Sequence, residues 1–363
     1  MRDAGPAVTT IGPSRLSIRW ADGTSDEVTA RWLRDACHCA QCRVAGSGQR
    51  HFDPADLPAA LSIDHVAMAH DGTVVVDLDD GHQAHVPART LAARQREPGP
   101  VPWGAQHLGV LQASAVSAQG DLEPFARALA HHGVALAYGL PVRAGAVLDF
   151  AAMVGFVRET NYGRLFDVKA TPDPSNLAYT AAGLPLHSDN PYRDPVPTVQ
   201  LLHCLVAAPT GGETRLADGF RAAATLATED ADAFDLLTST GVAFRYADAE
   251  VDLTARHPII ELDDRGRPVV VRMNNRSMQP PDLPATQIDA FYAAYTRFAR
   301  ILADTAAVVE LTLEPGWVVA FDNRRVLHAR GAYPANAPRH LQGCYIDIDA
   351  VASRARLART TIT

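Results

Sequence analysis

The sequence lacks long apolar runs, long basic runs and abundant cysteine. No stretch approaches the about 20 consecutive apolar residues that a membrane-spanning helix needs. The first six residues lack the apolar core of a secretory signal. A formal net charge of −8 and the absence of a Lys/Arg run are atypical of a nucleic-acid-binding surface. We therefore expect a cytoplasmic protein that binds neither a membrane nor nucleic acid.

Common cofactor-binding motifs are missing as well. There is no G-x-G-x-x-G fingerprint and no P-loop, and there are no internal repeats or low-complexity tracts. What remains is ordinary globular composition, with 47% hydrophobic and 20% charged residues in 363. This length allows one large or two modest domains with a sizeable core.

The two ends of the chain differ in pattern. Residues 16–20 alternate apolar and polar side chains, residues 73–78 are rich in valine, and turn residues follow or precede both segments. The chain then becomes rich in proline and glycine over residues 97–102, where neither helix nor sheet is favoured. We predict a small β-rich N-terminal domain over residues 1–98 and a larger domain over residues 104–363.

The larger domain mixes strands with a few helices, which predicts an α+β fold. Regular βαβ alternation is absent, which argues against a Rossmann sheet. Helical periodicity covers residues 121–132, 146–156 and 285–304. Strands are predicted at residues 134–137, 199–202, 318–321 and 345–348.

Three of the five cysteines, Cys37, Cys39 and Cys42, lie within six residues. This spacing suits a metal better than disulfides and fits a reducing compartment. Zinc takes four sulfur or nitrogen ligands in structural sites, so a fourth ligand is needed. The candidates are His38, His51, His82 and His85. We prefer His82 and predict a closed, structural zinc site.

A second candidate metal site combines His187 and Asp189 with the distant His328. Two imidazoles and one carboxylate form the facial triad of non-haem iron(II) oxygenases. We predict an extended segment here, in which the one-residue gap puts His187 and Asp189 on the same side of the strand. The His-x-Asp pair alone is weak evidence, because the chain contains 14 histidines.

Two further residues strengthen the iron hypothesis. Arg339 follows His328 by eleven residues, and a guanidinium is the best partner for the distal carboxylate of a 2-oxo dicarboxylate. Thr214 follows a Gly-Gly turn and offers a hydroxyl to the same carboxylate. Arg339 alone would more often be a surface charge.

Together these motifs make the chain similar to the 2-oxoglutarate dioxygenases of the taurine dioxygenase superfamily, and most of all to its γ-butyrobetaine hydroxylase branch. The resemblance runs along nearly the whole chain, including Trp32-Leu33-Arg34-Asp35 before the cysteines. In the larger domain its motifs are His187-Ser188-Asp189, Gln200-Leu201-Leu202-His203-Cys204, Gly211-Gly212-Glu213-Thr214, Phe321-Asp322-Asn323 with His328, and Arg339-His340-Leu341.

The resemblance implies a double-stranded β-helix (jelly-roll) core, Fe(II), 2-oxoglutarate and O2, and a homodimer. It implies that His187, Asp189 and His328 bind the iron and that Arg339 and Thr214 bind 2-oxoglutarate. It also supports His82 as the fourth zinc ligand. In such enzymes the conversion of 2-oxoglutarate to succinate and CO2 provides the oxidant that hydroxylates an unactivated C–H bond.

The resemblance also implies a small zwitterionic substrate with a trimethylammonium group. Aromatic faces attract a quaternary cation, and the matching positions are Tyr162, Phe166, Tyr179 and Tyr345, with Phe166 standing where the family usually has Trp. For the anionic end the matching positions are Asn176 and either Asn274 or Asn275.

Two polar residues depart from the butyrobetaine pattern, Asn190 and Arg276. The extra guanidinium would suit a doubly charged phosphonate, so 2-trimethylaminoethylphosphonate is the close second to γ-butyrobetaine. The motifs are also compatible with a small acid without a quaternary nitrogen as substrate. A protein of another class, a zinc-bearing sensor on a degenerate oxygenase fold, is the remaining hypothesis. Retention of all three iron ligands and of Arg339 speaks against the sensor.

Overall fold

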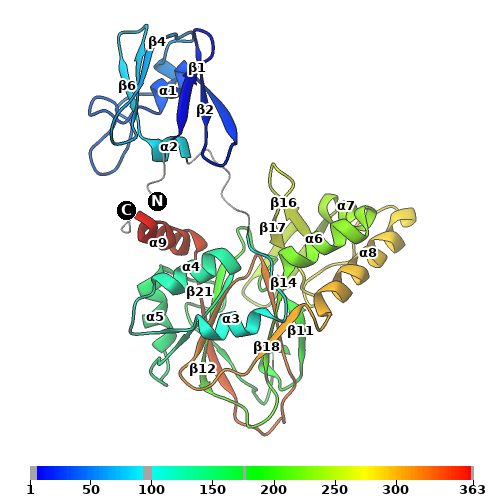
Figure 1. The fold of residues 1–363 in the computed structure, drawn as a ribbon. Helices are drawn as coiled ribbons and strands as arrows, with labels where there is room; N and C mark the ends of the chain where they lie inside the picture. The colour runs from blue at the N-terminus through cyan, green and yellow to red at the C-terminus, as the bar shows by residue number, and fades with distance from the viewer. Residues whose placement is uncertain (1–5, 93–99, 175–176, 361–363) are drawn as a thin grey trace. The chain divides into compact units, whose positions relative to one another are not determined.

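The computed structural model describes residues 6–92, 100–174 and 177–360, without the side chains of residues 358–360. It divides into two compact units, Met1–Gly99 and Pro100–Thr363 (Figure 1). The predicted domain end at residue 98 lies outside the described residues. Within the described part, no helix is long and apolar enough to cross a bilayer.

The first unit consists of two three-stranded antiparallel sheets around one apolar core. Leu16 and Ile18 point into this core from one sheet, and Val74 and Val76 from the other. The strands predicted at residues 16–20 and 73–78 are confirmed as β2 and β5. The elements are β1 (Ala7–Thr10), β2 (Arg15–Arg19), β3 (Ser25–Thr29), α1 (Ala30–Asp35), η1 (Pro54–Asp56), β4 (Ile63–Met68), β5 (Val74–Leu78), β6 (Gln83–Val86) and α2 (Ala88–Ala92).

The second unit is built on a large and a small sheet. The large sheet has the order β10-β21-β12-β19-β8-β7, with β9 also paired to β21, and the small one has the order β11-β20-β13-β18. Their strands are β7 (Val116–Ser117), β8 (Val134–Tyr138), β9 (Val157–Arg158), β10 (Phe166–Val168), β11 (Leu184–His187), β12 (Val199–Val206), β13 (Thr214–Asp218), β18 (Val308–Leu311), β19 (Val318–Asp322), β20 (Val326–Arg330) and β21 (His340–Ile346).

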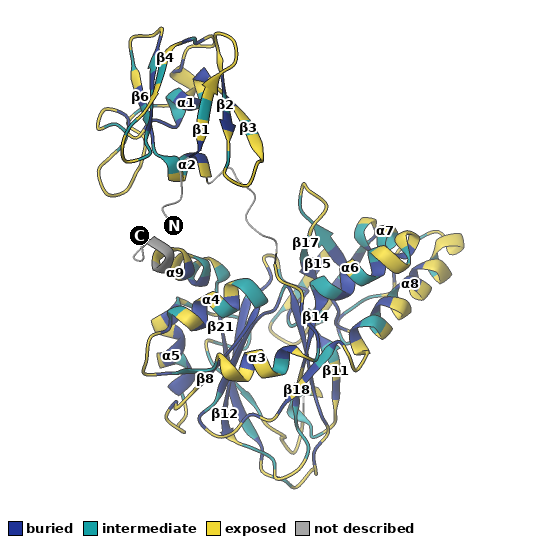
Figure 2. Ribbon diagram, viewed as in Figure 1, coloured by how far each residue is buried: buried dark blue, intermediate teal, exposed yellow. Residues whose placement is uncertain are grey.

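One buried cluster joins the two sheets. Leu202 and Phe321 of the large sheet pack with Leu216 and Val309 of the small sheet. Figure 2 shows these strands as mostly buried between more exposed helices. The predicted α+β double-stranded β-helix core is therefore confirmed, as is the β-rich N-terminal domain.

Helices cover both outer sides of this sandwich (Figure 1). On the large sheet, Phe125 of α4 and Phe150 of α5 pack against Leu201. On the other side, Phe291 of α8 shares a cluster with Leu327 of β20. The remaining elements of this unit are α3 (His107–Ala113), α4 (Glu123–His132), α5 (Ala146–Val154), η2 (Leu177–Tyr179), α6 (Gly219–Glu229), α7 (Ala231–Ser239), β14 (Gly241–Ala247), β15 (Asp252–Pro258), β16 (Ile260–Leu262), β17 (Pro268–Val271), α8 (Ala285–Ala303) and α9 (Ile348–Thr360).

The three predicted helices are confirmed as α4, α5 and α8, and three of the four predicted strands of this unit as β8, β12 and β19. The strand predicted over residues 345–348 is wrong at its end, because β21 stops at Ile346 and α9 begins at Ile348. Thr198 explains this change of direction, since its Oγ1 accepts from Ile348 N at 2.8 Å.

Candidate metal centres and active-site pocket

The small sheet brings together the two histidines of the predicted iron site. His187 ends β11 and lies directly opposite His328 of β20 in the antiparallel register. Asp189 Oδ1 is 3.3 Å from His187 Nε2, and its Oδ2 is 3.9 Å from His328 Nε2. One ligand atom from each residue lies within 4.8 Å of the others, so a single ion can contact all three.

The strand prediction for Asp189 is wrong, because β11 ends at His187 and Asp189 lies in the bend that follows. The side chain of Asn323 holds this bend. Its Oδ1 accepts from Asp189 N at 2.7 Å and its Nδ2 donates to Asp189 O at 2.9 Å. Tyr345 adds a hydrogen bond from its hydroxyl to Asp189 Oδ2 at 3.0 Å.

The protonation states favour metal binding. Burial, assisted by the neighbouring His187, lowers the pKa of His328 to about 3, so this imidazole is neutral near pH 7. His187 Nδ1 donates to Pro185 O at 2.8 Å, which leaves Nε2 as the lone-pair nitrogen facing Asp189. Burial opposes ionisation of Asp189, but its interactions with His328, His187 and Arg276 hold its pKa below the usual range. Two imidazole nitrogens and a carboxylate are a donor set that fits iron(II).

The first unit contains a second cluster of metal-ligating atoms. His82 Nε2 lies 3.4 Å from Cys37 Sγ, 3.8 Å from Cys39 Sγ and 3.4 Å from Cys42 Sγ. Tetrahedral zinc with ordinary Zn–S and Zn–N bond lengths separates sulfur from nitrogen by roughly 3.5 Å. The cluster therefore fits zinc.

Hydrogen bonds distinguish His82 from other candidates for the fourth ligand. His38 Nε2 contacts Thr90 Oγ1 at 3.2 Å, and His85 Nε2 contacts Gln83 Oε1 at 3.1 Å. The backbone N–H of His85 instead donates to Cys37 Sγ at 3.2 Å, which stabilises a thiolate there. Among the described residues, His82 is the histidine that completes the cysteine group.

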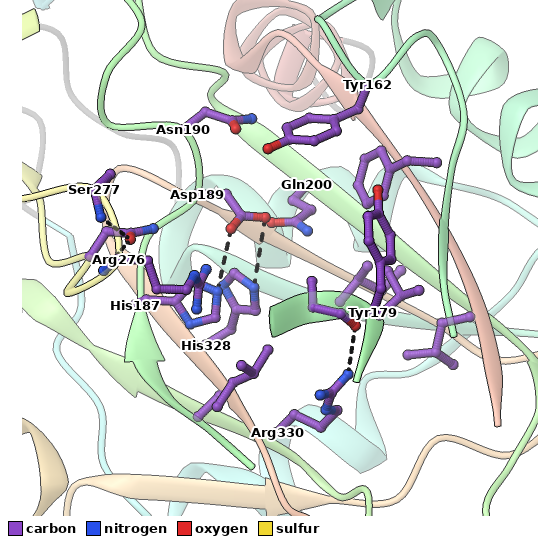
Figure 3. Close-up of a pocket in the computed structure, with 18 of the residues that line it drawn as sticks. Tyr162, Tyr179, His187, Asp189, Asn190, Gln200, Arg276, Ser277, His328 and Arg330 are labelled. Carbon is purple, nitrogen blue, oxygen red and sulfur yellow. Dashed lines mark hydrogen bonds and ion pairs between the residues drawn. The ribbon is translucent and has the colours of Figure 1, made fainter. Parts of the chain in front are cut away.

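The His187–Asp189–His328 cluster lines a pocket, and Figure 3 shows these three side chains close together among the other lining residues. The predicted 2-oxoglutarate residues Arg339 and Thr214 also line it. Residues from well-separated parts of the chain therefore meet in one pocket, because the sheets bring their strands together.

Arg339 lies against the Gly211-Gly212 turn. Both glycines have φ +72°, as the predicted turn requires. A Cβ at Gly212 would approach Arg339 Nε to 2.8 Å, so glycine makes room for the guanidinium. Arg339 Nη2 donates to Gly212 O at 3.1 Å, while the buried Nη1 has no partner among the described residues. A carboxylate would satisfy that unpaired donor.

The four aromatic positions matched to the cation cage all line the pocket; they are Tyr162, Phe166, Tyr179 and Tyr345. Phe166 packs on Tyr345 with ring centroids 5.2 Å apart. Figure 3 shows Tyr162 and Tyr179 across the pocket from Arg276. The pocket therefore has an aromatic wall next to the metal cluster.

Polar residues line another part of the same pocket. Asn190, Asn274 and Arg276 line it, whereas Asn275 lines a separate groove beside α8. Asn274 is occupied, since its Nδ2 donates to Ser188 O at 3.0 Å and its Oδ1 accepts from Arg276 N at 3.1 Å. Asn176 lies outside the described residues.

Unpaired donors mark this polar part. Asn190 Nδ2, Arg276 Nη1 and Ser277 Oγ are buried and have no hydrogen-bond partner within the described chain. Figure 3 shows Arg276 and Ser277 together beside His187. Three unpaired donors suit an anionic ligand group.

Sequence reasoning missed several pocket residues. Tyr192 and Tyr246 stack on each other with centroids 5.2 Å apart, and both line the pocket together with Gln200 and Arg330. Gln200 had a usable signal, because strand alternation places it on the same face as the buried Leu202. The others follow no local pattern.

Two family models match the chain. The model described as taurine catabolism dioxygenase TauD, TfdA family matches residues 95–345. The model described as γ-butyrobetaine hydroxylase-like, N-terminal, matches residues 11–87.

Curated relatives match over nearly the full length. A γ-butyrobetaine dioxygenase of Pseudomonas sp. strain AK-1 is 38% identical over 94% of this chain and 93% of that protein. The human γ-butyrobetaine dioxygenase is 31% identical over 97% of this chain and 96% of that protein. A trimethyllysine dioxygenase of Meyerozyma guilliermondii is 26% identical over 96% of this chain and 94% of that protein.

Proposed function

The chain belongs to the taurine catabolism dioxygenase TauD, TfdA family and is a 2-oxoglutarate-dependent dioxygenase; on this premise we propose that it hydroxylates a C–H bond of a small zwitterion bearing a trimethylammonium group. The observation that carries the proposal is one pocket that combines the His187–Asp189–His328 cluster, an aromatic wall and unpaired polar donors. All three relatives described above are dioxygenases, two of them named for γ-butyrobetaine and one for trimethyllysine.

In this proposal His187, Asp189 and His328 would hold Fe(II), and three protein ligands would leave positions free for further ligands. Bound iron, 2-oxoglutarate and O2 would supply the oxidant for C–H hydroxylation, with succinate and CO2 as co-products. Asn323 holds the backbone of Asp189, and Tyr345 fixes its carboxylate, through the hydrogen bonds given above. The protein thereby keeps the ligand set in place before substrate binds.

Arg339 and Thr214 are assigned to the distal carboxylate of 2-oxoglutarate. Arg339 is buried, and burial lowers the pKa of its guanidinium, although Tyr333, Cys204 and Glu213 oppose that shift. A buried guanidinium with an unpaired nitrogen gains most from a carboxylate partner, which restores both the charge balance and the hydrogen bond.

The trimethylammonium group is assigned to the aromatic wall. Such a cation donates no N–H, and the quadrupole of an aromatic ring attracts it without a hydrogen bond. Tyr162, Phe166, Tyr179 and Tyr345 supply these faces. Tyr345 also bonds Asp189, so a cation held there lies next to the metal ligands.

The anionic end is assigned to Asn190, Asn274 and Arg276. γ-Butyrobetaine is the first candidate substrate, because the relatives of highest identity described above are named for it. The second candidate is 2-trimethylaminoethylphosphonate. The observation favouring it is the unpaired nitrogen of Arg276, which suits a doubly charged group.

A panel assay tests both candidates. Fe(II)-dependent succinate release is measured with γ-butyrobetaine, 2-trimethylaminoethylphosphonate and a taurine-like sulfonate, on wild type and on Arg276→Ala. Turnover of a trimethylammonium compound supports the proposal, and turnover of the sulfonate alone refutes it. A selective loss of phosphonate turnover in Arg276→Ala would assign Arg276 to the doubly charged anion.

The cysteine cluster is proposed to bind a structural zinc ion through Cys37, Cys39, Cys42 and His82. Its four protein ligands leave no open position for catalysis. The cytoplasmic location and the homodimer stay predictions; gel filtration with light scattering would test the dimer.

A further inference from the structure

Arg330 organises the segment that carries Tyr179. It ends β20, two residues after His328. Its Nη1 donates to Ala178 O at 3.1 Å, and its Nη2 donates to Thr180 O at 2.7 Å and to Ala182 O at 2.6 Å. One guanidinium thus binds three backbone carbonyls around the cage residue, and Figure 3 shows Arg330 directly beneath Tyr179.

Tyr333 holds the same segment from a second side. Its backbone N–H donates to Ala181 O at 3.2 Å, and its hydroxyl donates to Thr180 O at 3.4 Å. The guanidinium carbons of Arg330 and Arg339 each lie 5.4 Å from the centroid of the Tyr333 ring. Tyr333 therefore touches both the segment around Tyr179 and the residue assigned to 2-oxoglutarate.

Burying the charged guanidinium of Arg330 costs free energy unless hydrogen-bond acceptors, here backbone carbonyls, compensate for the lost water. Arg330 is only 6% exposed, so its charge is buried. Three carbonyl dipoles compensate its buried charge. In Tyr179's segment the regular structure is one short turn, Leu177–Tyr179, so these bonds are major constraints on its conformation.

We propose that Arg330 is a positioning residue: with Tyr333 it fixes the backbone of residues 178–182, so that Tyr179 presents its ring to the trimethylammonium group. The pair also ties this wall to Arg339, which links the substrate end of the pocket to the co-substrate end. This inference rests on the proposed function for the role of Tyr179, but its backbone component is independent of any substrate.

The test uses Arg330→Lys, which keeps the charge but cannot reach three carbonyls at once, and Tyr333→Phe, which removes one hydroxyl and keeps the ring. Arg297→Lys is the matched control, since Arg297 is an exposed, ion-paired arginine on α8. Hydrogen exchange of the full-length protein is followed by mass spectrometry in peptides covering residues 177–183. Arg330→Lys should raise exchange there about tenfold, as expected for losing charged hydrogen bonds, and Tyr333→Phe should do so less.

Kinetics give the second measurement. For Arg330→Lys, KM for the trimethylammonium substrate should rise about tenfold and KM for 2-oxoglutarate less than about threefold. The ratio of succinate to hydroxylated product should also rise, because with a misplaced substrate some 2-oxoglutarate is converted to succinate without hydroxylation. Equal rises in both KM values with no change in that ratio would overturn the inference.

Failure of the proposed function gives a different result. If wild type turns over no trimethylammonium compound, the proposed substrate class is wrong, and hydrogen exchange alone then decides the backbone role of Arg330. Unchanged exchange at residues 177–183 in both variants overturns the inference whatever the substrate. Should Arg330→Lys fail to fold, Tyr333→Phe still decides, because its deletion is confined to one hydroxyl.

Discussion

The two candidate metal centres each gather their ligand atoms within 4.8 Å of one another, yet they differ in what surrounds them. In the first unit, Cys37 and Cys42 belong to the apolar core, at 0% and 2% exposure. In the second unit, the ligands line a pocket that also contains unpaired hydrogen-bond donors and aromatic rings. A metal in the first site can only stabilise, whereas a metal in the second can meet further ligands. Chemistry is therefore decided by the surroundings of a metal cluster as much as by its ligands.

Removing a cysteine ligand should have the largest energetic effect. Cys42→Ser should abolish zinc binding and unfold the first unit, since structural zinc contributes about 10 kcal/mol or more to such sites. Calorimetry and zinc analysis of the full chain would follow this, and the transition of the second unit should persist. His38→Gln is the matched control and should keep its zinc, because His38 contacts Thr90. Loss of zinc in that control would mean that the fourth ligand is misassigned.

Removing an iron ligand should act on catalysis and leave folding intact. His187→Ala should lower succinate release by about a thousandfold or more, because a metal ion contributes several kcal/mol to such a reaction. Zinc content should stay at the wild-type level, and the melting temperature should change little. His257→Ala, a histidine of the same unit that does not line the pocket, serves as control. Substantial activity in His187→Ala would contradict the assignment of this centre to catalysis and of the cysteine cluster to structure.

Both ligand sets could be predicted from the sequence, for different reasons. Three cysteines within six residues are a local signal, whereas the preference for His82 over three other histidines was supported by the family resemblance. Prediction of the iron ligands depended on several motifs that follow one another in order along the chain, from His187 to Arg339. The bend at Asp189 could not be predicted, because Asn323, more than a hundred residues away, holds it through two hydrogen bonds.

The outer pocket was harder to predict than the ligands. Tyr246 and Arg330 reach it from separate strands, and Tyr192 lies in an irregular segment without periodicity. Their positions depend on tertiary contacts that no short window contains. The alternation of β12 did contain a signal for Gln200, because Leu202, two residues further along the strand, shares its face.

The next largest effect should be on the affinity for 2-oxoglutarate, after substitution of Arg339. Arg339→Gln should raise KM for 2-oxoglutarate about a hundredfold, as expected for losing a buried charged hydrogen bond. KM for the trimethylammonium substrate should change far less, and zinc content not at all. Initial-rate kinetics with each substrate varied in turn would measure both. A larger effect on the trimethylammonium KM than on that of 2-oxoglutarate would place Arg339 at the wrong end of the pocket.

The smallest effect should come from a hydrogen-bond chain that joins the two ends of the substrate site. Tyr192 donates its hydroxyl proton to Asn190 Oδ1 at 2.6 Å, and the Tyr162 hydroxyl lies 3.2 Å from the Tyr192 hydroxyl. Since Tyr192 has one proton, Tyr162 must be the donor in the second bond. The chain thereby turns the Asn190 amide so that its unpaired Nδ2 is free to meet an anion.

Tyr192→Phe should raise KM for the trimethylammonium substrate about fivefold, the cost of about one neutral hydrogen bond, and leave KM for 2-oxoglutarate unchanged. Tyr295→Phe is a matched control, because Tyr295 lies in the separate groove beside α8. A doubly charged substrate should lose more than a singly charged one, since the amide it meets is the group that Tyr192 orients. Equal losses for both substrates would mean that Tyr192 acts only as part of the aromatic wall, and the polar end would then depend on Arg276 and Asn274 without help from the amide.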